Sequence, residues 1–219
     1  MSEAVAKGGS REKRGSKEKR GFIGLKDLVF CVLMGVLMLV ASLVVALPFA
    51  ASLPMMYFLV PAIAALIWGV LLVVVMAKCP RTGAVFVPFV VYAAYFLASG
   101  SVYVAAMIVV AGLLSECVLL GGGYASTVRG FVPVLLLSWI NAMGSTLTML
   151  LFRDSMVQAY LGMGMDAAAA EAAIAAVETF WLAPENVLLA LATSAAGAVV
   201  GYLVGAKFVR RHFRPAGVM

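Results

Sequence analysis

Long apolar segments without charge alternate with short polar breaks along most of this chain. No charged residue occurs in 28–77 or in 82–115, whereas residues 1–27 hold 12 of the 26 charged residues. A helix rises 1.5 Å per residue, so 28–77 as one helix would measure about 75 Å, against roughly 30 Å for the hydrocarbon core of a bilayer. The apolar runs must therefore fold back on themselves.

Proline and small polar residues supply the turns. Pro48, Ser52 and Pro54 interrupt the first run, because proline lacks the N–H donor of a helix and clashes with the preceding turn. Ser99-Gly100-Ser101 and Gly121-Gly122-Gly123 divide the later part of the chain. A backbone inside a bilayer must satisfy its own hydrogen bonds, so we expect an all-α integral membrane protein. The pattern predicts six transmembrane helices, at about 28–47, 55–77, 84–98, 101–120, 131–152 and 186–206.

The distribution of positive charge predicts the orientation of this bundle. Fifteen of the sixteen Lys and Arg residues fall in tails and connections on one side, and only Arg153 falls on the other. Cytoplasmic loops carry an excess of Lys and Arg, so we expect both termini in the cytoplasm and the six-helix domain, 27–207, in the plasma membrane. The basic tail 1–26 has the composition of a disordered segment, and 208–219 forms a second basic tail. Charges beside the membrane favour a role in topology over a lipid or nucleic-acid site, so nucleic acid is not expected as a partner.

The connection between the fifth and sixth predicted spans is long and acidic. Its centre, 166–182, is predicted to form a helix, with Asp166 as the N-cap and an alanine run of high helix propensity. Ile174, Val177 and Trp181 form an apolar stripe on one face. We expect an amphipathic helix on the exterior surface of the bundle, acting either as a connector or as a lid over an outward-facing site.

Composition removes several classes of function. Hydrophobic residues make up 64% of the chain and charged residues 12%, whereas soluble domains have about 45–50% and 25%. The one histidine, His212, lies in the C-terminal tail, which excludes a serine–histidine dyad and an HExxH zinc site. No GxxxxGK[ST] motif occurs, so ATP binding through a P-loop is excluded. We therefore expect no enzyme activity, catalytic residue, metal or cofactor.

Glu116 is the one acidic residue inside a predicted span, near its cytoplasmic end. A charge at the bilayer centre costs about 2.5–3.5 kcal/mol on insertion scales, and a partner near the interface offsets most of that cost. We expect an ion pair with Arg81 or Arg129, with proton or cation coupling as the alternative. In the last span, Gly197, Gly201 and Gly205 repeat at intervals of four on one face. Such small residues allow close helix approach, within the bundle or to a partner subunit.

Polar and aromatic residues within the predicted spans are candidates for a ligand pocket. Asn141 lies in mid-span, and a buried amide needs hydrogen-bond partners, either on another helix or on a ligand. The candidate substrate-binding residues are Asn141, Trp139, Tyr95, Tyr92, Trp68 and Asn186.

Several short motifs, taken in order, resemble one known group. They are Lys26-Asp27-Leu28, Pro61, Lys78-Cys79-Pro80-Arg81-Thr82-Gly83, Gly112-Leu113-Leu114-Ser115-Glu116, Gly122-Gly123-Tyr124 and His212-Phe213-Arg214-Pro215-Ala216-Gly217. With six spans and both ends inside, this order resembles the substrate-binding S components of energy-coupling-factor (ECF) transporters, in particular the MptD-like (Trep_Strep) family. Members of such families usually carry Lys before the His-Phe pair, where this chain has Arg211.

The resemblance implies a subunit that captures a small micronutrient outside the cell and delivers it through an ATP-driven complex. Its partners would be a membrane coupling subunit and two cytoplasmic ATPase subunits. In S components small residues of the first helix meet the coupling subunit, and the nearest matches here are Gly35, Ser42 and Ala46. Leu39 interrupts that series of small residues. The alternative function is a stand-alone small-solute carrier driven by an ion gradient, with Glu116 as the coupling group.

Overall fold

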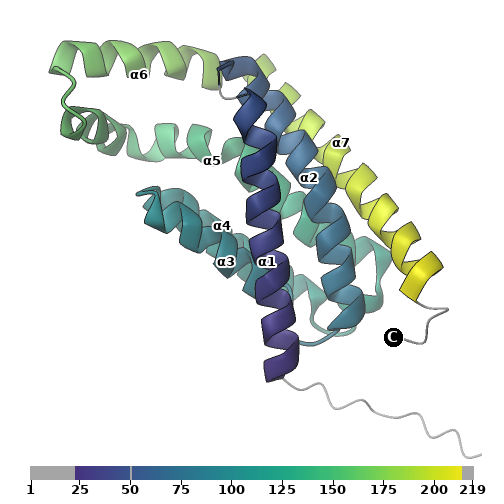
Figure 1. The fold of residues 1–219 in the computed structure, drawn as a ribbon. Helices are drawn as coiled ribbons and strands as arrows, with labels where there is room; N and C mark the ends of the chain where they lie inside the picture. The colour runs from purple at the N-terminus through teal and green to yellow at the C-terminus, as the bar shows by residue number, and fades with distance from the viewer. Residues whose placement is uncertain (1–22, 50, 214–219) are drawn as a thin grey trace, which may run out of the picture.

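Within residues 23–49 and 51–213, which the computed structural model describes, the chain forms seven α-helices joined by short turns (Figure 1). Two 3-10 turns, η1 (Leu47–Phe49) and η2 (Gly123–Ala125), and a π-helical turn, η3 (Val209–Phe213), accompany them. Most of the predicted tail 1–26 and the last six residues lie outside the described part. The α-helices are α1 (Leu25–Ala46), α2 (Leu53–Lys78), α3 (Phe86–Ala98), α4 (Val102–Leu119), α5 (Thr127–Gly162), α6 (Ala167–Trp181) and α7 (Pro184–Phe208).

Five helices in the described part are long and apolar enough to cross a membrane. They are Leu25–Phe49, Pro54–Lys78, Val102–Leu119, Thr127–Gly144 and Pro184–Arg211. The remaining predicted span, 84–98, is the shorter apolar helix α3, whose 13 residues cover about 20 Å. The first break falls as predicted, since α1 runs into η1 and α2 restarts with Pro54 in its first turn.

Helix α5 differs most from its predicted bounds of 131–152. It continues through Arg153 and Asp154 to Gly162, with non-helical backbone angles at Phe152 (φ −140°, ψ 37°) where the helix kinks. The charged pair therefore follows a kink and does not end the helix. The reason is that α6 carries two carboxylates which pair with Arg153, so the helix can carry this charge past the apolar segment.

The pair α2 and α7 has the most extensive contact in the bundle. Gly197 and Gly201 of α7 lie against α2 so closely that a Cβ atom on either would collide with the carbonyl oxygen of Ala62 or Leu66. A Cβ on Gly205 would come 2.9 Å from Val70 Cα. The three glycines thus bring two backbones together within this chain.

Glu116 has partners other than the predicted ones. Its Oε1 accepts hydrogen bonds from the backbone N–H groups of Val85 (2.8 Å) and Phe86 (2.9 Å), and its Oε2 accepts one from the Tyr124 hydroxyl (2.7 Å). Burial, and after it the hydrogen bond to Glu116, raises the pKa of Tyr124, which keeps this hydroxyl a donor. The first N–H groups of a helix have no partner within the helix, so a carboxylate there is well placed.

The two arginines expected beside Glu116 have other contacts. Arg81 pairs with Asp27 at 3.1 Å, which connects the loop after α2 to the first turn of α1. Arg129 donates a long hydrogen bond, 3.5 Å, to the carbonyl of Leu120. The predicted ion pair is therefore replaced by backbone amides and a phenol.

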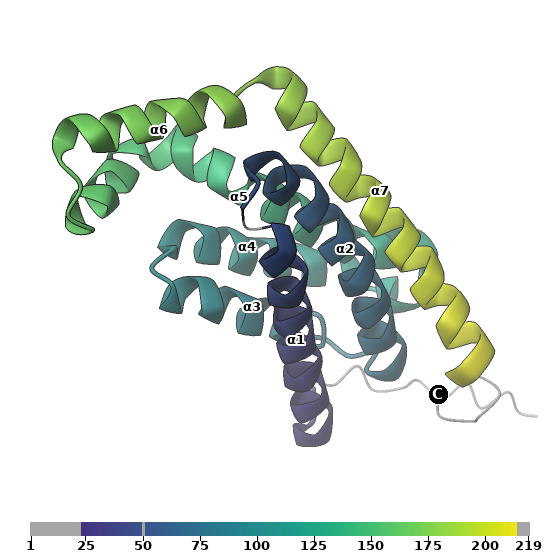
Figure 2. The same cartoon turned by 45° about the horizontal axis from the view of Figure 1, so that its top comes forward.

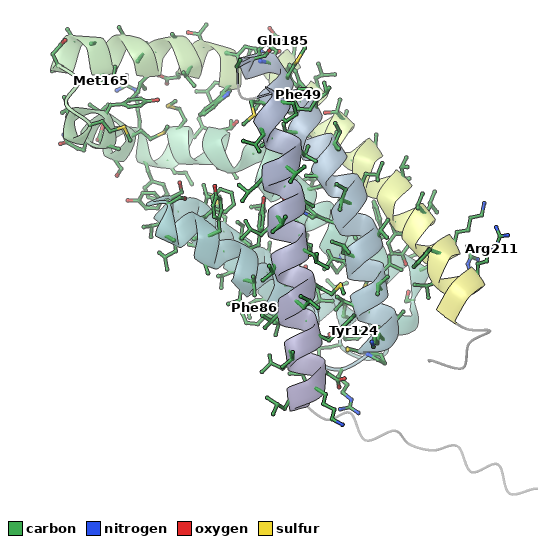
Figure 3. All side chains as sticks on the ribbon, viewed as in Figure 1. Phe49, Phe86, Tyr124, Met165, Glu185 and Arg211 are labelled. Atoms are coloured by element: carbon green, nitrogen blue, oxygen red, sulfur yellow. The ribbon has the colours of Figure 1, made fainter. Side chains whose placement is uncertain are left out.

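The bundle has two distinct ends. Helix α1 begins and α7 ends at one of them, with Tyr124 and Arg211 on that side, whereas Phe49, Glu185 and α6 lie at the other (Figures 1 and 3). The α3–α4 hairpin projects on the side away from α7, and so do α6 and the end of α5 (Figure 2). Asp166 caps α6 as predicted, since its side chain accepts a hydrogen bond from the Ala169 N–H at 2.9 Å.

Candidate functional site

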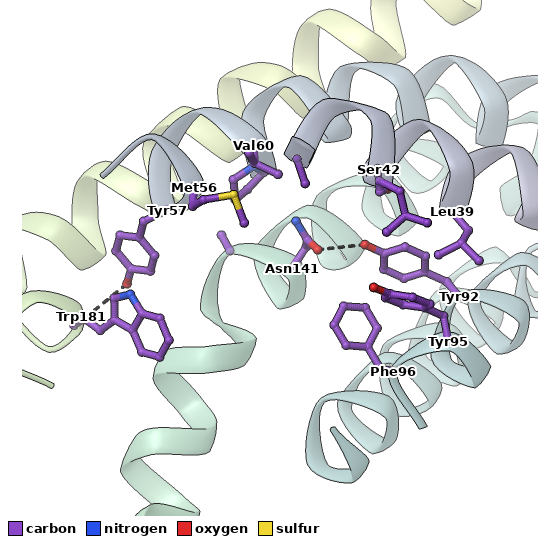
Figure 4. A pocket seen from close by; sticks show the side chains of 14 residues that line it. Leu39, Ser42, Met56, Tyr57, Val60, Tyr92, Tyr95, Phe96, Asn141 and Trp181 are labelled. Carbon is purple, nitrogen blue, oxygen red and sulfur yellow. Dashed lines mark hydrogen bonds between the residues drawn. The ribbon is translucent and has the colours of Figure 1, made fainter. Parts of the chain in front are cut away.

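A central cavity of about 280 Å³ lies between the later part of α1, the beginning of α2, the end of α3 and the middle of α5 (Figure 4). Trp181, the last residue of α6, lies at its edge. The cavity therefore occupies the half of the bundle nearer α6, away from the ends where α1 begins and α7 finishes. Its lining residues are Leu39, Ser42, Leu43, Ala46, Met56, Tyr57, Val60, Pro61, Tyr92, Tyr95, Phe96, Asn141, Ala142 and Trp181.

Three aromatic residues of α3 form one wall of this cavity. Tyr92, Tyr95 and Phe96 fall on one side of the helix because residues three and four apart are neighbours there. The rings of Tyr92 and Tyr95 each meet Phe96 edge to face, with centroids 5.3 and 5.4 Å apart. Edge-to-face contacts of this kind fix the orientation of the rings.

Asn141 of α5 faces this wall. The Tyr92 hydroxyl donates a 3.0 Å hydrogen bond to Asn141 Oδ1, drawn in Figure 4. Because Asn141 Oδ1 accepts this hydrogen bond, the Nδ2 group of the same amide remains available as a donor. Asn141 lines the cavity, so a ligand there could accept from it. The pair therefore presents an oriented amide donor.

Buried polar contacts support the wall from behind. The Ser42 hydroxyl donates to the carbonyl of Met38 (2.7 Å) and accepts from Trp68 Nε1 (3.0 Å). The Trp68 ring is fully buried and packs edge to face on Tyr92, with centroids 5.2 Å apart. Trp68 thus positions Tyr92 without lining the cavity.

An aromatic cluster closes the side of the cavity near α6. The Tyr57 hydroxyl lies 2.8 Å from Thr146 Oγ1 and donates to the Trp181 carbonyl at 3.3 Å. The Tyr57 and Trp181 rings stack with centroids 6.2 Å apart, and Phe180 meets Tyr57 edge to face. This cluster attaches the end of α6 to α2 and α5.

The structure brings together three of the six predicted substrate-binding residues, since Tyr92, Tyr95 and Asn141 all line the cavity. Trp68 lies behind Tyr92, as described above. Trp139 is 39% exposed and is not among the lining residues. Asn186 donates from Nδ2 to the carbonyl of Phe180 at 2.9 Å, so it holds the turn between α6 and α7.

The residues predicted to contact a partner subunit face the interior instead. A Cβ atom on Gly35 would come 2.9 Å from Val91 Cβ and 3.0 Å from Pro88 Cα of α3. Ser42 is 9% exposed, and both Ser42 and Ala46 line the cavity. The small residues of α1 thus receive α3 and border the cavity, and the opposite face of α1 is the one left open.

Sequence reasoning missed Tyr57, Phe96 and Trp181 as lining residues. Tyr57 lies near the end of a predicted span, where an aromatic belt at the membrane interface explains it equally well. Trp181 was recognised only as part of the apolar stripe of α6. Trp181 reaches the cavity because α6 folds back toward α2 and α5. The sequence of the helix alone does not indicate this tertiary contact.

Ion pairs connect α6 to the kinked end of α5. Arg153 Nη2 lies 2.7 Å from Glu171 Oε2, and Arg153 Nε lies 3.3 Å from Glu178 Oε2. Hydrogen bonds to Glu171 and then to Glu178 raise the pKa of Arg153. One guanidinium therefore spans two turns of α6.

A second cavity, of about 400 Å³, lies between the α3–α4 turn and the end of α5 beyond its kink. Tyr103 stacks on Phe152 there with ring centroids 3.5 Å apart, and its hydroxyl lies 3.3 Å from Ser155 Oγ at an exposed position. This cavity separates two projecting hairpins, whereas the central one is walled by four helices of the bundle. The central cavity is the stronger candidate for a specific site.

Comparison with known proteins identifies a family. Neither the curated proteins nor the solved structures include a significant match to this chain. A family model described as a hypothetical bacterial integral membrane protein (Trep_Strep) matches residues 25–214, which covers all seven α-helices. The chain therefore belongs to the Trep_Strep family of bacterial integral membrane proteins.

Proposed function

We propose that this protein is the substrate-capture subunit of an ATP-driven ECF-type importer for a small micronutrient. The observation that carries the proposal is the central cavity, where aromatic rings and an oriented amide are held by buried and partly buried hydrogen bonds. Small-molecule sites have this composition, with mostly apolar and aromatic walls and a few placed polar groups.

The orientation that we propose puts the cavity toward the outside. With both termini in the cytoplasm, the end where α1 begins and α7 finishes faces inward, and α6 lies at the exterior surface. The cavity lies in the half nearer α6, so a solute would enter from outside. The C-terminal end of α6 borders the cavity through Trp181. This position favours a role for α6 as a lid on the cavity and not merely as a connector between α5 and α7.

A coupling subunit would have to contact a face of α1 other than the predicted one. Gly35 and Ser42 are covered, and the opposite side of α1 exposes a continuous apolar row. We propose this row as the contact with the coupling subunit, through Val29, Leu33, Val36, Val40 and Val44.

The alternative, an ion-coupled carrier, needs a titratable group that can exchange a proton or cation during transport. Glu116 was its candidate, but both carboxylate oxygens are engaged, by two backbone amides and by Tyr124. A group that holds the start of α3 in place is poorly suited to reversible exchange with solvent. The importer subunit is therefore the function that the geometry supports best.

Affinity purification of the tagged chain from its native membrane tests the proposal. We expect a membrane coupling subunit and two ATPase subunits to be recovered with it, and a small solute to be released on denaturation and detected by mass spectrometry. Uptake of that solute should stop when the ATPase genes are deleted. Recovery of the chain without these subunits, together with uptake that persists after the deletion, would contradict it.

A further inference from the structure

The central cavity is lined by uncharged side chains. No Lys, Arg, His, Asp or Glu occurs among its lining residues in the described part of the chain. Its polar groups are the hydroxyls of Ser42, Tyr57, Tyr92 and Tyr95, the amide of Asn141 and the indole N–H of Trp181. An ion removed from water needs a counter-charge or several hydrogen bonds to offset its lost hydration. A cavity built in this way disfavours an ionised ligand.

Most hydrogen-bond acceptors around the cavity already have donors. Asn141 Oδ1 accepts from Tyr92, and the Ser42 hydroxyl accepts from Trp68 while donating to the Met38 carbonyl. The Tyr57 hydroxyl is engaged by Thr146 and by a backbone carbonyl. Among the contacts of the described residues, the Tyr95 hydroxyl, which can donate or accept, has no such bond, so a ligand meets few free acceptors on the protein side.

Donors, in contrast, are left over. Within residues 23–49 and 51–213, Asn141 Nδ2 has no hydrogen-bond partner, and its orientation is set by the bond that Tyr92 makes to the same amide. Trp181 Nε1 is buried at the edge of the cavity and also has no partner. Burial keeps the Trp181 donor out of reach of a ligand, whereas an acceptor on a ligand can pair with Asn141 Nδ2, which faces the cavity. The unpaired amide donor of Asn141 therefore points to a ligand with a carbonyl oxygen or a ring nitrogen.

The size and the walls of the cavity limit the ligand further. A volume of about 280 Å³ is just below the roughly 300–1,000 Å³ typical of small-molecule pockets. The rings of Tyr92, Tyr95 and Phe96 border one side, and the stacked Tyr57 and Trp181 border another (Figure 4). Aromatic walls favour a flat ring, because ring faces and edges pack well against one another.

We propose that the cavity selects a compact, uncharged ring compound that offers a carbonyl oxygen or ring nitrogen to Asn141 Nδ2. The inference rests on the proposed function, since it names the class of solute that the importer subunit captures. Asn141 is the residue that recognises the acceptor, and Tyr92 is a positioning residue that orients its amide.

Matched pairs of probes test this selection. The protein in lipid nanodiscs is equilibrated by dialysis against equal concentrations of nicotinamide and nicotinate, uracil and orotate, and benzamide and benzoate. Mass spectrometry measures each compound on both sides, and empty nanodiscs correct for partition into lipid. We expect the neutral member of at least one pair to be enriched at least tenfold over its carboxylate. Equal enrichment, enrichment of a carboxylate, or enrichment of no compound would overturn the proposal.

Variants locate the selection in the cavity. Asn141→Leu should abolish the enrichment, and Tyr103→Phe, in the second cavity, should leave it unchanged. Gel filtration and thermal unfolding show whether Asn141→Leu is folded. If it is not, the comparison of each neutral compound with its carboxylate on the wild-type protein still tests the proposal. Enrichment that survives in a folded Asn141→Leu protein would contradict the role of Asn141.

This experiment and the test of the proposed function fail separately. Loss of selectivity in dialysis would leave recovery of the coupling and ATPase subunits untouched, so only the class of solute would be withdrawn. Selective binding without those subunits would leave the cavity as a binding site and withdraw the importer.

Discussion

Tyr92 and Asn141 join α3 to α5 across the central cavity through a 3.0 Å hydrogen bond in which the tyrosine hydroxyl donates to Asn141 Oδ1. Tyr92 is buried, and its ring is held edge to face by Trp68 on one side and by Phe96 on the other. The orientation of the Asn141 amide is thus determined by packing between three helices, because Trp68 belongs to α2.

Tyr92→Phe removes the donor and keeps the ring. Asn141 Oδ1 then loses its partner and the amide is free to turn, so we expect binding of the retained solute to weaken about tenfold, or about 1.4 kcal/mol. Isothermal titration with the solute identified by mass spectrometry measures the effect. Tyr103→Phe is the matched control, since its hydroxyl is exposed and belongs to the other cavity. Equal affinity for the two variants would contradict the role of this hydrogen bond.

Gly201→Ala tests the close contact between α2 and α7. Its Cβ atom would collide with the Leu66 carbonyl oxygen, which belongs to a helix backbone and cannot rotate away. We expect the free energy of unfolding to fall by about 1–3 kcal/mol, the usual cost of overpacking. Thermal unfolding in detergent, followed by tryptophan fluorescence, measures the change.

Gly162→Ala provides the control for the glycine contact. Nothing lies within 4 Å of a Cβ built on Gly162, at the end of α5. A substitution at such an open position should change stability by less than about 0.5 kcal/mol. The same unfolding temperature for both alanine variants would show that the two helices can move apart at little cost.

Glu116→Ala should destabilise the protein by about 2–3 kcal/mol, because it leaves the Val85 and Phe86 amides and the Tyr124 hydroxyl without their charged acceptor. Glu116→Gln keeps one oxygen for the amides and offers its NH2 group to the Tyr124 oxygen, so it should lose less than half as much. Chemical unfolding of both variants measures the difference. An ion-coupled carrier predicts another result, with transport lost in the Gln variant while its stability is retained.

The predicted helices agree with the structure where the physical signal is local, and five of the six predicted spans are long and apolar enough to cross a membrane. Charge-free runs longer than one bilayer thickness, broken by Pro48 and Pro54, require helices that fold back, whatever lies next to them. The cap at Asp166 depends only on the three residues that follow it, and it too is found. The glycines of α7 were recognised because their spacing defines a single face.

The rest depended on contacts that the sequence does not mark. Helix α1 is apolar on every side, so nothing in it shows that Ser42 faces a cavity while Val40 faces outward. The partners of Glu116 are mainly backbone amides, which carry no side-chain signature. Arg153 looked like the end of a span because its two acidic partners come 18 and 25 residues later.

Arg153→Gln should loosen α6 without unfolding the bundle. Arg153 contributes the two ion pairs that the described residues form between α5 and α6, and its acidic partners Glu171 and Glu178 lie two turns apart on α6. Both pairs are partly exposed, so each contributes little to global stability and is weakened by salt. We expect backbone amides of α6 to exchange with deuterium several-fold faster in the variant, while amides of α2 and α7 exchange at unchanged rates.

Salt and a neighbouring charge provide the controls for this prediction. Raising the ionic strength to about 1 M shortens the Debye length to about 3 Å, so exchange in α6 of the wild-type protein should approach that of the Arg153→Gln protein. Asp154→Asn changes the adjacent exposed charge and should leave exchange in α6 unchanged. If α6 exchanged equally slowly in all three proteins, its attachment would be due to the apolar contacts of Ile174 and Trp181, and the ion pairs would have no part in holding it over the cavity.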